Sequence, residues 1–509
     1  MEKANVSRIN VMSNLARLAM IVFAVAMAAN ASIVAAADIP FSVTLEEMGV
    51  DGLPGLHSAA WGCYEGKLIL IGGRTGGMHG FSSRTSAGKP SFPPPEANDS
   101  VYVVELASQR LLGSAKVNGL PNDIARQLRA TNTQFTTRGK WLYIVGGYGM
   151  TADQKAMETI SRAVAIDMPA LITAVANREP LNEAFAQQYI FGASNQLLAV
   201  TGGALEVLHD EYLMLVFGHR FDGLYFVGGS NVTQTYTQCV RAFRFEVADN
   251  QLNVQLVAQQ PENPFLQPVD GPYHRRDLSV EPTLVLKDGV PSVQIAAYGG
   301  VFKGGLFEGY LNPIYVDITS PGLHKPPEIS LNADQATVQL LSQYECAAIS
   351  SFSLKQQTMY TTFFGGISQY YWDGQSLKRD KPDLSAKPPI DGLPFINSIS
   401  TLKRGPEGSA QYLHVAQQFP PKPFEGGTSP TLMTCLGAQT IFVPAHGVPN
   451  KHDVLLLDEL AKPTVIGYLF GGIAAEKGYP TQSCASPKLY QVTLRPDAAT
   501  DSLKLVKPD

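Results

Sequence analysis

Arginine, histidine and aromatic residues gather at two kinds of position in this 509-residue chain. Some follow doubled glycines, and others precede the short apolar segments that lead into them. The first set comprises Arg74, His79, Tyr148, His219, Arg220, Asp222 and Tyr370, and the second His57, Arg129, His274, Arg275, Arg276, Asp277 and Glu345. Arginine pairs in a planar fork with carboxylate or phosphate, and histidine exchanges protons near neutral pH. The two sets together favour a small anion or a sugar as ligand.

Each residue type suggests a role in such a site. The hypothesis assigns the anion clamps to Arg74, Arg220 and one of Arg275 or Arg276. Proton carriers are sought among His79, His219 and His274, with Asp222, Asp277 or Glu345 orienting them. Tyr148 and Tyr370 offer aromatic faces on which a sugar ring can stack. The alternative is structural: residues 274–277 form a charged turn that pairs with itself, and Tyr370 packs in a loop.

Doubled glycines punctuate the chain, each at the end of a short apolar run. The copies are LILIGG ending at Gly73, WLYIVGG at Gly147, IAAYGG at Gly300, TTFFGG at Gly366 and IGYLFGG at Gly472. A sixth run, LMLVFGH, ends at His219, and we interpret this histidine as a replacement for the second glycine. Glycine reaches backbone angles closed to other residues, so each run predicts a strand with a tight exit.

The segments around each glycine pair predict one repeating unit. A short strand precedes the glycine strand, and a further strand follows the loop, as in residues 101–106, 162–168, 241–247, 313–318, 397–404 and 488–495. In the last unit the preceding strand is either residues 440–449 or 454–460. Helices are predicted within residues 121–130 and 168–177, from apolar residues spaced three and four apart.

This pattern predicts an all-β protein: a six-bladed propeller over residues 38–509, with long loops and short helical insertions. Because successive strands of a blade alternate in direction, the loops after the glycines and those before the blades open on one face. We therefore expect the arginine- and histidine-rich positions to meet at a common mouth.

The glycine strands resemble those of kelch-type propellers, the superfamily of the galactose oxidase central domain and the periplasmic sialic acid mutarotases. The chain also resembles secreted bacterial kelch proteins of unassigned role. Of the spaced aromatic residues of that family it keeps only Tyr102, Tyr315 and Tyr490, and it has three tryptophans in all. The resemblance implies the fold, and function lies in the loops.

Three functions are compatible with the resemblance. One is a module that binds a small anionic or carbohydrate ligand, or a protein partner, through its long loops. Another is a sialic acid mutarotase-like sugar epimerase with a carboxylate clamp and an acid or base. The third is a galactose oxidase-like copper oxidase, whose metal needs two histidines, two tyrosines and a cysteine linked to one tyrosine. No such ligand motif matches this sequence position by position, and we expect no cofactor and no bound metal.

The first 37 residues are typical of a signal peptide. Lys3, Arg8 and Arg17 precede an apolar stretch over residues 18–29, and small residues follow through Ala37. A retained membrane anchor is the alternative. We expect a periplasmic or secreted monomer with no membrane association once the signal is removed.

Net charge and cysteine content exclude two further classes of protein. The formal net charge of -5 offers no electrostatic case for a nucleic-acid partner. Five scattered cysteines are too few for a disulfide scaffold. Cys435 and Cys484 either form a bridge or act as small buried hydrophobic residues, and at least one cysteine of the five is left unpaired or pairs with another chain.

Overall fold

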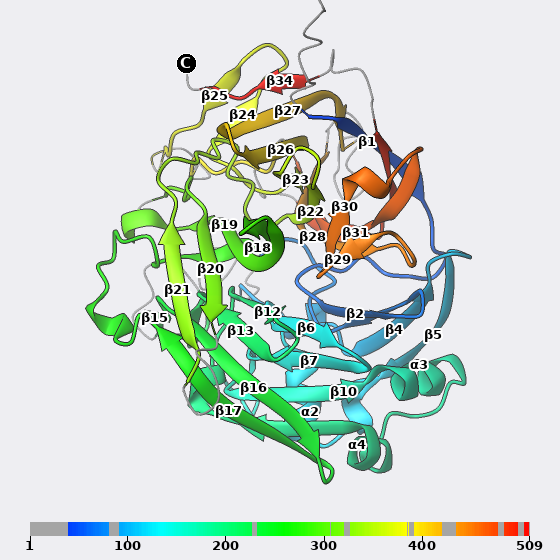
Figure 1. Ribbon diagram of the computed structural model, residues 1–509. Helices are drawn as coiled ribbons and strands as arrows, with labels where there is room; N and C mark the ends of the chain where they lie inside the picture. Colours follow the sequence, from blue (N-terminus) through cyan, green and yellow to red (C-terminus); the bar gives the residue numbers. More distant parts are fainter. Residues whose placement is uncertain are drawn as a thin grey trace, which may run out of the picture.

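The computed structural model describes residues 39–80, 91–225, 232–305, 307–319, 326–383, 385, 391–419, 434–476, 483–496 and 503–507. The signal peptide predicted for residues 1–37 lies outside this part of the chain. Strands dominate, and six large sheets surround a common centre (Figure 1). Within the described ranges, none of the helices has the length and apolar character needed to cross a bilayer.

The first three sheets each contain four antiparallel strands. The first runs β2 (Ala60–Tyr64), β3 (Lys67–Ile71), β4 (Ser100–Glu105) and β5 (Arg110–Lys116). The second runs β6 (Gln134–Arg138), β7 (Trp141–Val145), β10 (Arg162–Asp167) and β11 (Ile190–Ser194). The third runs β12 (Ala204–Leu208), β13 (Tyr212–Val216), β16 (Val240–Ala248) and β17 (Gln251–Gln260).

The last three sheets keep this order, and the fifth and sixth have additional strands. The fourth runs β18 (Arg276–Lys287), β19 (Val290–Val301), β20 (Ile314–Thr319) and β21 (Glu328–Ala333). The fifth runs β22 (Ala347–Ser353), β23 (Thr358–Phe364), β26 (Ser398–Gly405) and β27 (Gly408–Gln418), flanked by β34 (Leu503–Leu505) outside and by β30 (Val454–Leu456) with β29 (Asn450–Lys451) inside. The sixth runs β28 (Thr434–Pro444), β31 (Thr464–Glu476), β33 (Leu489–Pro496) and β1 (Phe41–Met48), with β32 (Ser483–Ala485) on β31.

Within the described residues, three hairpins and three short helices lie in the connections between the large sheets. The hairpins are β8 (Tyr148–Met150) with β9 (Met157–Thr159), β14 (His219–Asp222) with β15 (Thr233–Tyr236), and β24 (Tyr370–Trp372) with β25 (Leu377–Arg379). The helices are α2 (Asn122–Gln127), α3 (Met168–Ala176) and α4 (Glu183–Tyr189). Both predicted helices are confirmed, whereas α4 was not predicted. Short 3₁₀-helices include Pro94–Glu96 and Pro264–Leu266.

Alternating side chains explain why the sheets pack face to face around the centre. In β3, Ile69 and Ile71 pack against the second sheet, whereas Leu68 and Leu70 pack against Phe470 of the sixth sheet. Successive side chains of a strand point to opposite faces, so a middle strand buried on both sides is apolar throughout. Each sheet packs in this way against the next, and the sixth packs back against the first, which closes the ring. The fold is a mainly-β, kelch-like propeller.

The sequence pattern located the first three strands of each sheet. All six strands predicted after the glycine loops are present, and the open choice in the last unit is settled because residues 440–444 lie in β28. Residues 454–456 form β30 instead, which pairs in parallel with β22. Cys63, Cys239 and Cys346 carry free thiols, whereas the bridge considered for Cys435 involves a side chain outside the described set.

One glycine was misassigned. In the intact pairs the first glycine has φ near +65° and the second near +90°, as in Gly146 (63°) and Gly147 (89°). In the sixth copy Phe217 has φ 49° and Gly218 has φ 87°. The missing glycine is therefore the first one, replaced by Phe217, and His219 is the residue after the pair. His219 thus occupies the same structural position as Arg74 and Tyr148.

Candidate functional site

Six residues in the left-handed conformation lie where the chain enters the innermost strand of each sheet. They are Ser58, Asn132, Gly202, Asp277, Glu345 and Gln439, with φ between 49° and 61°. Backbone hydrogen bonds join neighbours, among them Asn132 N to Ser58 O (3.2 Å) and Asp277 N to Gly202 O (2.7 Å). We call these six residues the neck. All six line a cavity of about 170 Å³, and five of them also line a second cavity of about 110 Å³ on the loop side.

The loop-side cavity is the candidate site, because most of the predicted residues meet there. Its walls come from the residues that follow the glycine pairs and from those that precede the inner strands. Eight of the predicted residues line it: His57, Arg74, His79, Tyr148, His219, Arg276, Asp277 and Glu345. The mouth inferred from strand alternation is thus present, with a different membership from the one predicted.

Arg74 forms one wall of the cavity. Its backbone bridges to His57, which places the residue after the first glycine pair beside the entry to β2. Its guanidinium donates to Glu96 (2.9 Å) and lies 4.9 Å from the centre of the Phe92 ring. His79 stacks on the same ring at 4.9 Å. A paired cation and stacked rings therefore share this wall.

Arg276 forms the opposite wall. Its Nη1 contacts His219 Nε2 at 3.3 Å, and its Nε lies 3.4 Å from Asp277 Oδ2. The guanidinium also lies 5.2 Å from the centre of the Phe302 ring. Because arginine only donates, His219 presents a lone pair at Nε2 and is neutral. Both cavity arginines thus have a carboxylate partner already.

The histidines of the cavity are neutral at physiological pH. Burial, assisted by the positive charge of Arg74, lowers the pKa of His57 to about 3. Burial likewise lowers the pKa of His79 to about 4. Burial and the nearby charge of Arg276 hold the pKa of His219 well below its usual value. These imidazoles can donate or accept a hydrogen bond, but they do not add positive charge to the site.

Asp277 and Glu345 form a carboxyl pair at the neck. They occupy neighbouring positions of the neck, both line the two cavities, and each affects the pKa of the other. Burial and then the negative charge of Asp277 raise the pKa of Glu345 well above its ordinary value. Burial raises the pKa of Asp277 too, although Arg276 opposes that shift. Because Arg276 lies beside Asp277, the negative charge of the pair is favoured on Asp277, whereas burial favours the neutral form of Glu345.

Tyr148 contributes its ring to the cavity while its hydroxyl is engaged elsewhere. The hydroxyl donates to Gly223 O and accepts from Tyr225 N (3.0 Å). The ring meets Phe92 and Phe221 edge to face, with centroids 5.2 and 5.7 Å apart. Tyr148 therefore fixes the aromatic wall.

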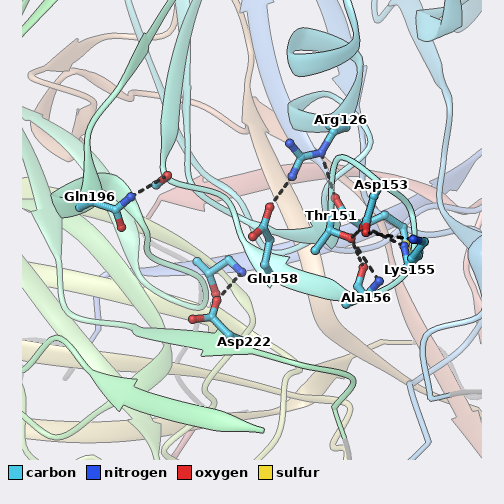
Figure 2. Close-up of polar contacts among 11 residues, drawn as sticks. Arg126, Thr151, Asp153, Lys155, Ala156, Glu158, Gln196 and Asp222 are labelled. Carbon is cyan, nitrogen blue, oxygen red and sulfur yellow. Dashed lines mark hydrogen bonds and ion pairs between the residues drawn. The ribbon is translucent and has the colours of Figure 1, made fainter. Parts of the chain in front are cut away.

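Arg220 and Asp222 do not line the cavity. They pair with each other at 2.7 Å on β14, and the Arg220 side chain is 47% exposed. Asp222 also accepts from the Thr159 backbone N (3.3 Å), beside the hairpin that Arg126 holds through Glu158 (Figure 2). In a four-residue strand alternate side chains turn outward, and Arg220 is one of these. The expected third clamp thus faces solvent.

Three further predicted residues also lie outside the cavity. Arg275, 1% exposed, donates to the carbonyls of Pro272, Gly299 and Asn312, so its guanidinium stabilises backbone. His274 stacks on Tyr236 at 3.7 Å. Tyr370, the first residue of β24, packs against an apolar cluster. The structural alternative therefore describes Tyr370, whereas Arg275 is neither a ligand contact nor part of a self-paired turn.

Sequence reasoning missed part of the wall. Phe92, Tyr225, Asp391 and Gln439 line the cavity, and none was singled out. Gln439 had a signal, because it occupies the same entry position in its sheet as Asp277 and Glu345. The other three lie in loops without a periodic pattern. In the described part of the chain, no three histidine, cysteine, aspartate or glutamate side chains are grouped so that they could hold a metal ion.

Comparison with known proteins adds little to this picture. No family model matches the sequence, and no curated protein matches it. A solved structure titled "Structure of YjhT" aligns with 90% of this chain and 99% of its own, at 8% sequence identity and a TM-score of 0.43. A likeness at that level carries no information about a ligand, so the propeller assignment stands on the closed ring of sheets described above.

Proposed function

We propose that this protein is an exported, six-bladed kelch-like propeller that binds a small sugar or sugar acid in the loop-side cavity. Each of the six large sheets is counted as one blade. The walls combine aromatic rings with charged groups that are already paired, a composition suited to hydroxyl-rich ligands. The ligand contacts would come from Arg74, Arg276 and His57, with Phe92 as a stacking face.

One observation carries this proposal: among the residues that the structure describes, buried hydrogen-bonding atoms at the cavity make no hydrogen bond. They are Arg74 Nε, His57 Nε2, Thr131 Oγ1 and Arg276 Nε, the last of which has only its ion-pair contact with Asp277 at 3.4 Å. A buried polar atom without a partner costs about 1–3 kcal/mol. The two arginine atoms can only donate, so the missing partners are acceptor oxygens, which sugars and carboxylates carry in abundance.

A binding screen tests the proposal. Monosaccharides and their uronic acids are titrated into the purified protein by calorimetry, and Arg74→Gln and Arg276→Gln are compared with the wild type. We expect each substitution to weaken a hit at least tenfold, because each removes a buried donor. Arg220→Gln is the matched control, since that arginine is exposed and outside the cavity. Equal affinity in all four proteins would place the ligand elsewhere.

An epimerase-like activity is the second candidate, favoured by the protonated carboxyl of Glu345 in the cavity. An acid next to a bound sugar can protonate the ring oxygen while a base removes the hydroxyl proton, which opens the ring. NMR exchange between the anomers of any sugar that binds distinguishes the two functions. Accelerated exchange that Glu345→Gln abolishes would establish catalysis, and unchanged exchange would leave a binding protein.

Export is a separate part of the proposal. It rests on the order of basic, apolar and small residues in the first 37 positions. Sequencing the amino terminus of protein recovered outside the cytoplasm tests it, with cleavage expected after Ala31 or Ala37. An intact terminus in a membrane fraction would favour the retained anchor.

A further inference from the structure

The carboxyl pair at the neck has a backbone built to receive it. Asp277 and Glu345 occupy equivalent positions in neighbouring sheets, with φ 55° and 51°. Gly202 occupies the same position in the preceding sheet, and a Cβ there would lie 2.4 Å from Asp277 Oδ1. Glycine at position 202 therefore leaves the space that the Asp277 carboxylate fills. The pair lines both cavities and therefore lies at the boundary between the loop-side cavity and the cavity of about 170 Å³.

Charge balance at this point depends on a single proton. Arg276 carries one positive charge and contacts Asp277, whose side chain is 14% exposed. If Asp277 and Glu345 were both ionised, the largely buried group would carry a net charge of -1. With one proton on the two carboxyl groups the group of three is neutral, and burial raises the pKa of both acids. Burial in a medium of low dielectric strongly favours the neutral group.

A ligand that competes for Arg276 disturbs this balance. A carboxylate that binds the Arg276 guanidinium in competition with Asp277 brings a second negative charge beside Asp277. The repulsion favours the neutral form of Asp277, which then binds a proton from solvent. An uncharged sugar binds the same guanidinium without adding charge, and the pair keeps its single proton.

We propose that the Asp277–Glu345 pair couples ligand binding to proton uptake: a carboxylate that binds at Arg276 enters together with one proton, which the pair accepts, whereas a neutral sugar enters alone. This inference rests on the proposed function and extends it to how the site treats acids and neutral sugars. By linkage, affinity for the acid falls up to tenfold per pH unit as pH rises, because binding takes up a proton.

The other groups that face the pair do not account for such uptake. Arg276 stays charged, and Gln439 does not titrate. Tyr344 keeps its proton, because burial and neighbouring carboxylates raise its pKa well above the ordinary value. The cavity histidines titrate far below pH 6. Asp391, whose pKa is raised by burial, is the remaining competitor, and Asp391→Asn serves as its control.

An infrared pH titration tests the pair without any ligand. At pH 7 we expect the protonated-carboxyl absorption of the full-length protein to include, beside that of Glu206 and Glu281, one band that either Glu345→Gln or Asp277→Asn removes, since the remaining acid then pairs with Arg276. Arg276→Gln neutralises the cation as a bound anion would, and we expect it to add one protonated carboxyl. No change in the band in any of the three variants would overturn the proposal. Thermal melting confirms that each variant is folded.

Calorimetry with D-glucuronate and D-glucose tests the coupling itself. The two sugars share a ring and differ in a carboxylate at one carbon. Titrations in two buffers of different ionisation enthalpy measure the protons bound on complex formation. We expect the protein to bind as much as one proton together with glucuronate, and the affinity for glucuronate to be as much as tenfold lower at pH 8 than at pH 7. Glucose should bind without proton uptake and with the same affinity at both pH values. Uptake should persist in Asp391→Asn and disappear in Glu345→Gln.

The outcomes separate this inference from the proposed function. Glucuronate binding without proton uptake overturns the coupling and leaves the binding function intact. If neither sugar binds, the proposed function fails for these probes, and the infrared titration of Arg276→Gln alone decides whether the pair answers a change of charge at position 276. Uptake that Asp391→Asn removes would also overturn the assignment to Asp277 and Glu345.

Discussion

Two positions on strand β18 treat their carboxyl groups differently. Asp277, at the neck, lies beside Arg276 and interacts with Glu345. Glu281, four residues further along, is about 13 Å deeper at the usual rise of a strand. The charges that act on Glu281 come from Glu206 and Asp453, both acidic, and burial together with this repulsion raises its pKa well above the ordinary value.

Because of this difference, the carboxyl groups at the neck can change their charge when a ligand binds, whereas those around Glu281 line neither of the two cavities. The neck opens onto a cavity and includes a cation, so its carboxyl groups can change partners. The deeper trio consists of Glu206, Glu281 and Asp453, and Asp453 directly precedes β30. Strand β30 pairs in parallel with β22, with Leu455 opposite Ser351 and Leu456 opposite Phe352. Burial and repulsion between acids raise the pKa of Glu206 to about 8 and raise the pKa values of Glu281 and Asp453, so protonation of this group favours the folded state. We therefore expect the neck to govern ligand binding and the trio to govern stability at high pH.

The largest effect is expected from crowding the neck. Gly202→Ala places a methyl group 2.4 Å from Asp277 Oδ1 and should destabilise the protein by about 1–3 kcal/mol while displacing the carboxylate. Gly139→Ala is the matched control, because Gly139 has φ 60° but open space around its Cβ. Chemical denaturation measures both. Equal losses would mean that only backbone strain matters.

A smaller effect, with a defined pH dependence, is expected from the deeper trio. Since the folded-state pKa of Glu281 lies above its unfolded value, the stability that this group contributes is present at acidic pH and is lost as pH rises toward the folded value. Glu281→Gln removes that loss. Melting curves should show a variant more stable than wild type by about 1–3 °C at pH 8.5 and no more stable at pH 5.

The buried histidines should produce the opposite slope. Their folded-state pKa values lie below the unfolded value of 6.5, so stability is lost as pH falls from 6.5 toward 4. His414, whose Nε2 contacts Thr401 Oγ1 at 2.8 Å, lies on β27 outside the cavity lining. His414→Gln should flatten the acid side of the stability curve and leave sugar affinity unchanged. A reduced affinity would link this strand to the site.

The smallest effect is expected at the exposed pair on β14. Arg220→Gln breaks an ion pair that solvent screens, so stability should change by less than about 0.5 kcal/mol. Denaturant titration at low and high salt checks this. A larger loss would show that the β14–β15 hairpin supports the cavity wall.

The sequence predicted those parts of the fold and of the candidate site that depend on interactions between residues close together in the chain. The glycine pairs predicted the second strand of every sheet, because backbone angle and burial both constrain that position. The outermost strands, such as β17 and β21, escaped because their outer faces are exposed and their pattern is weak. In the same way, Arg74 and Arg276 were found from their places beside inner strands, whereas Arg220 was misplaced because side-chain direction within a hairpin depends on register. Phe92 and Tyr225 reach the cavity through loops whose path no local pattern determines.

The register of β1 against β33, from Phe41 with Pro496 to Met48 with Leu489, has a consequence for biogenesis. The first strand to leave the ribosome pairs with one of the last, across more than 440 residues of intervening chain. Until translation is nearly complete, β1 has an unsatisfied edge that any extended segment could occupy. A nascent chain of this protein is therefore expected to depend on a holding factor, and removal of residues 41–48 should yield open molecules that join end to end.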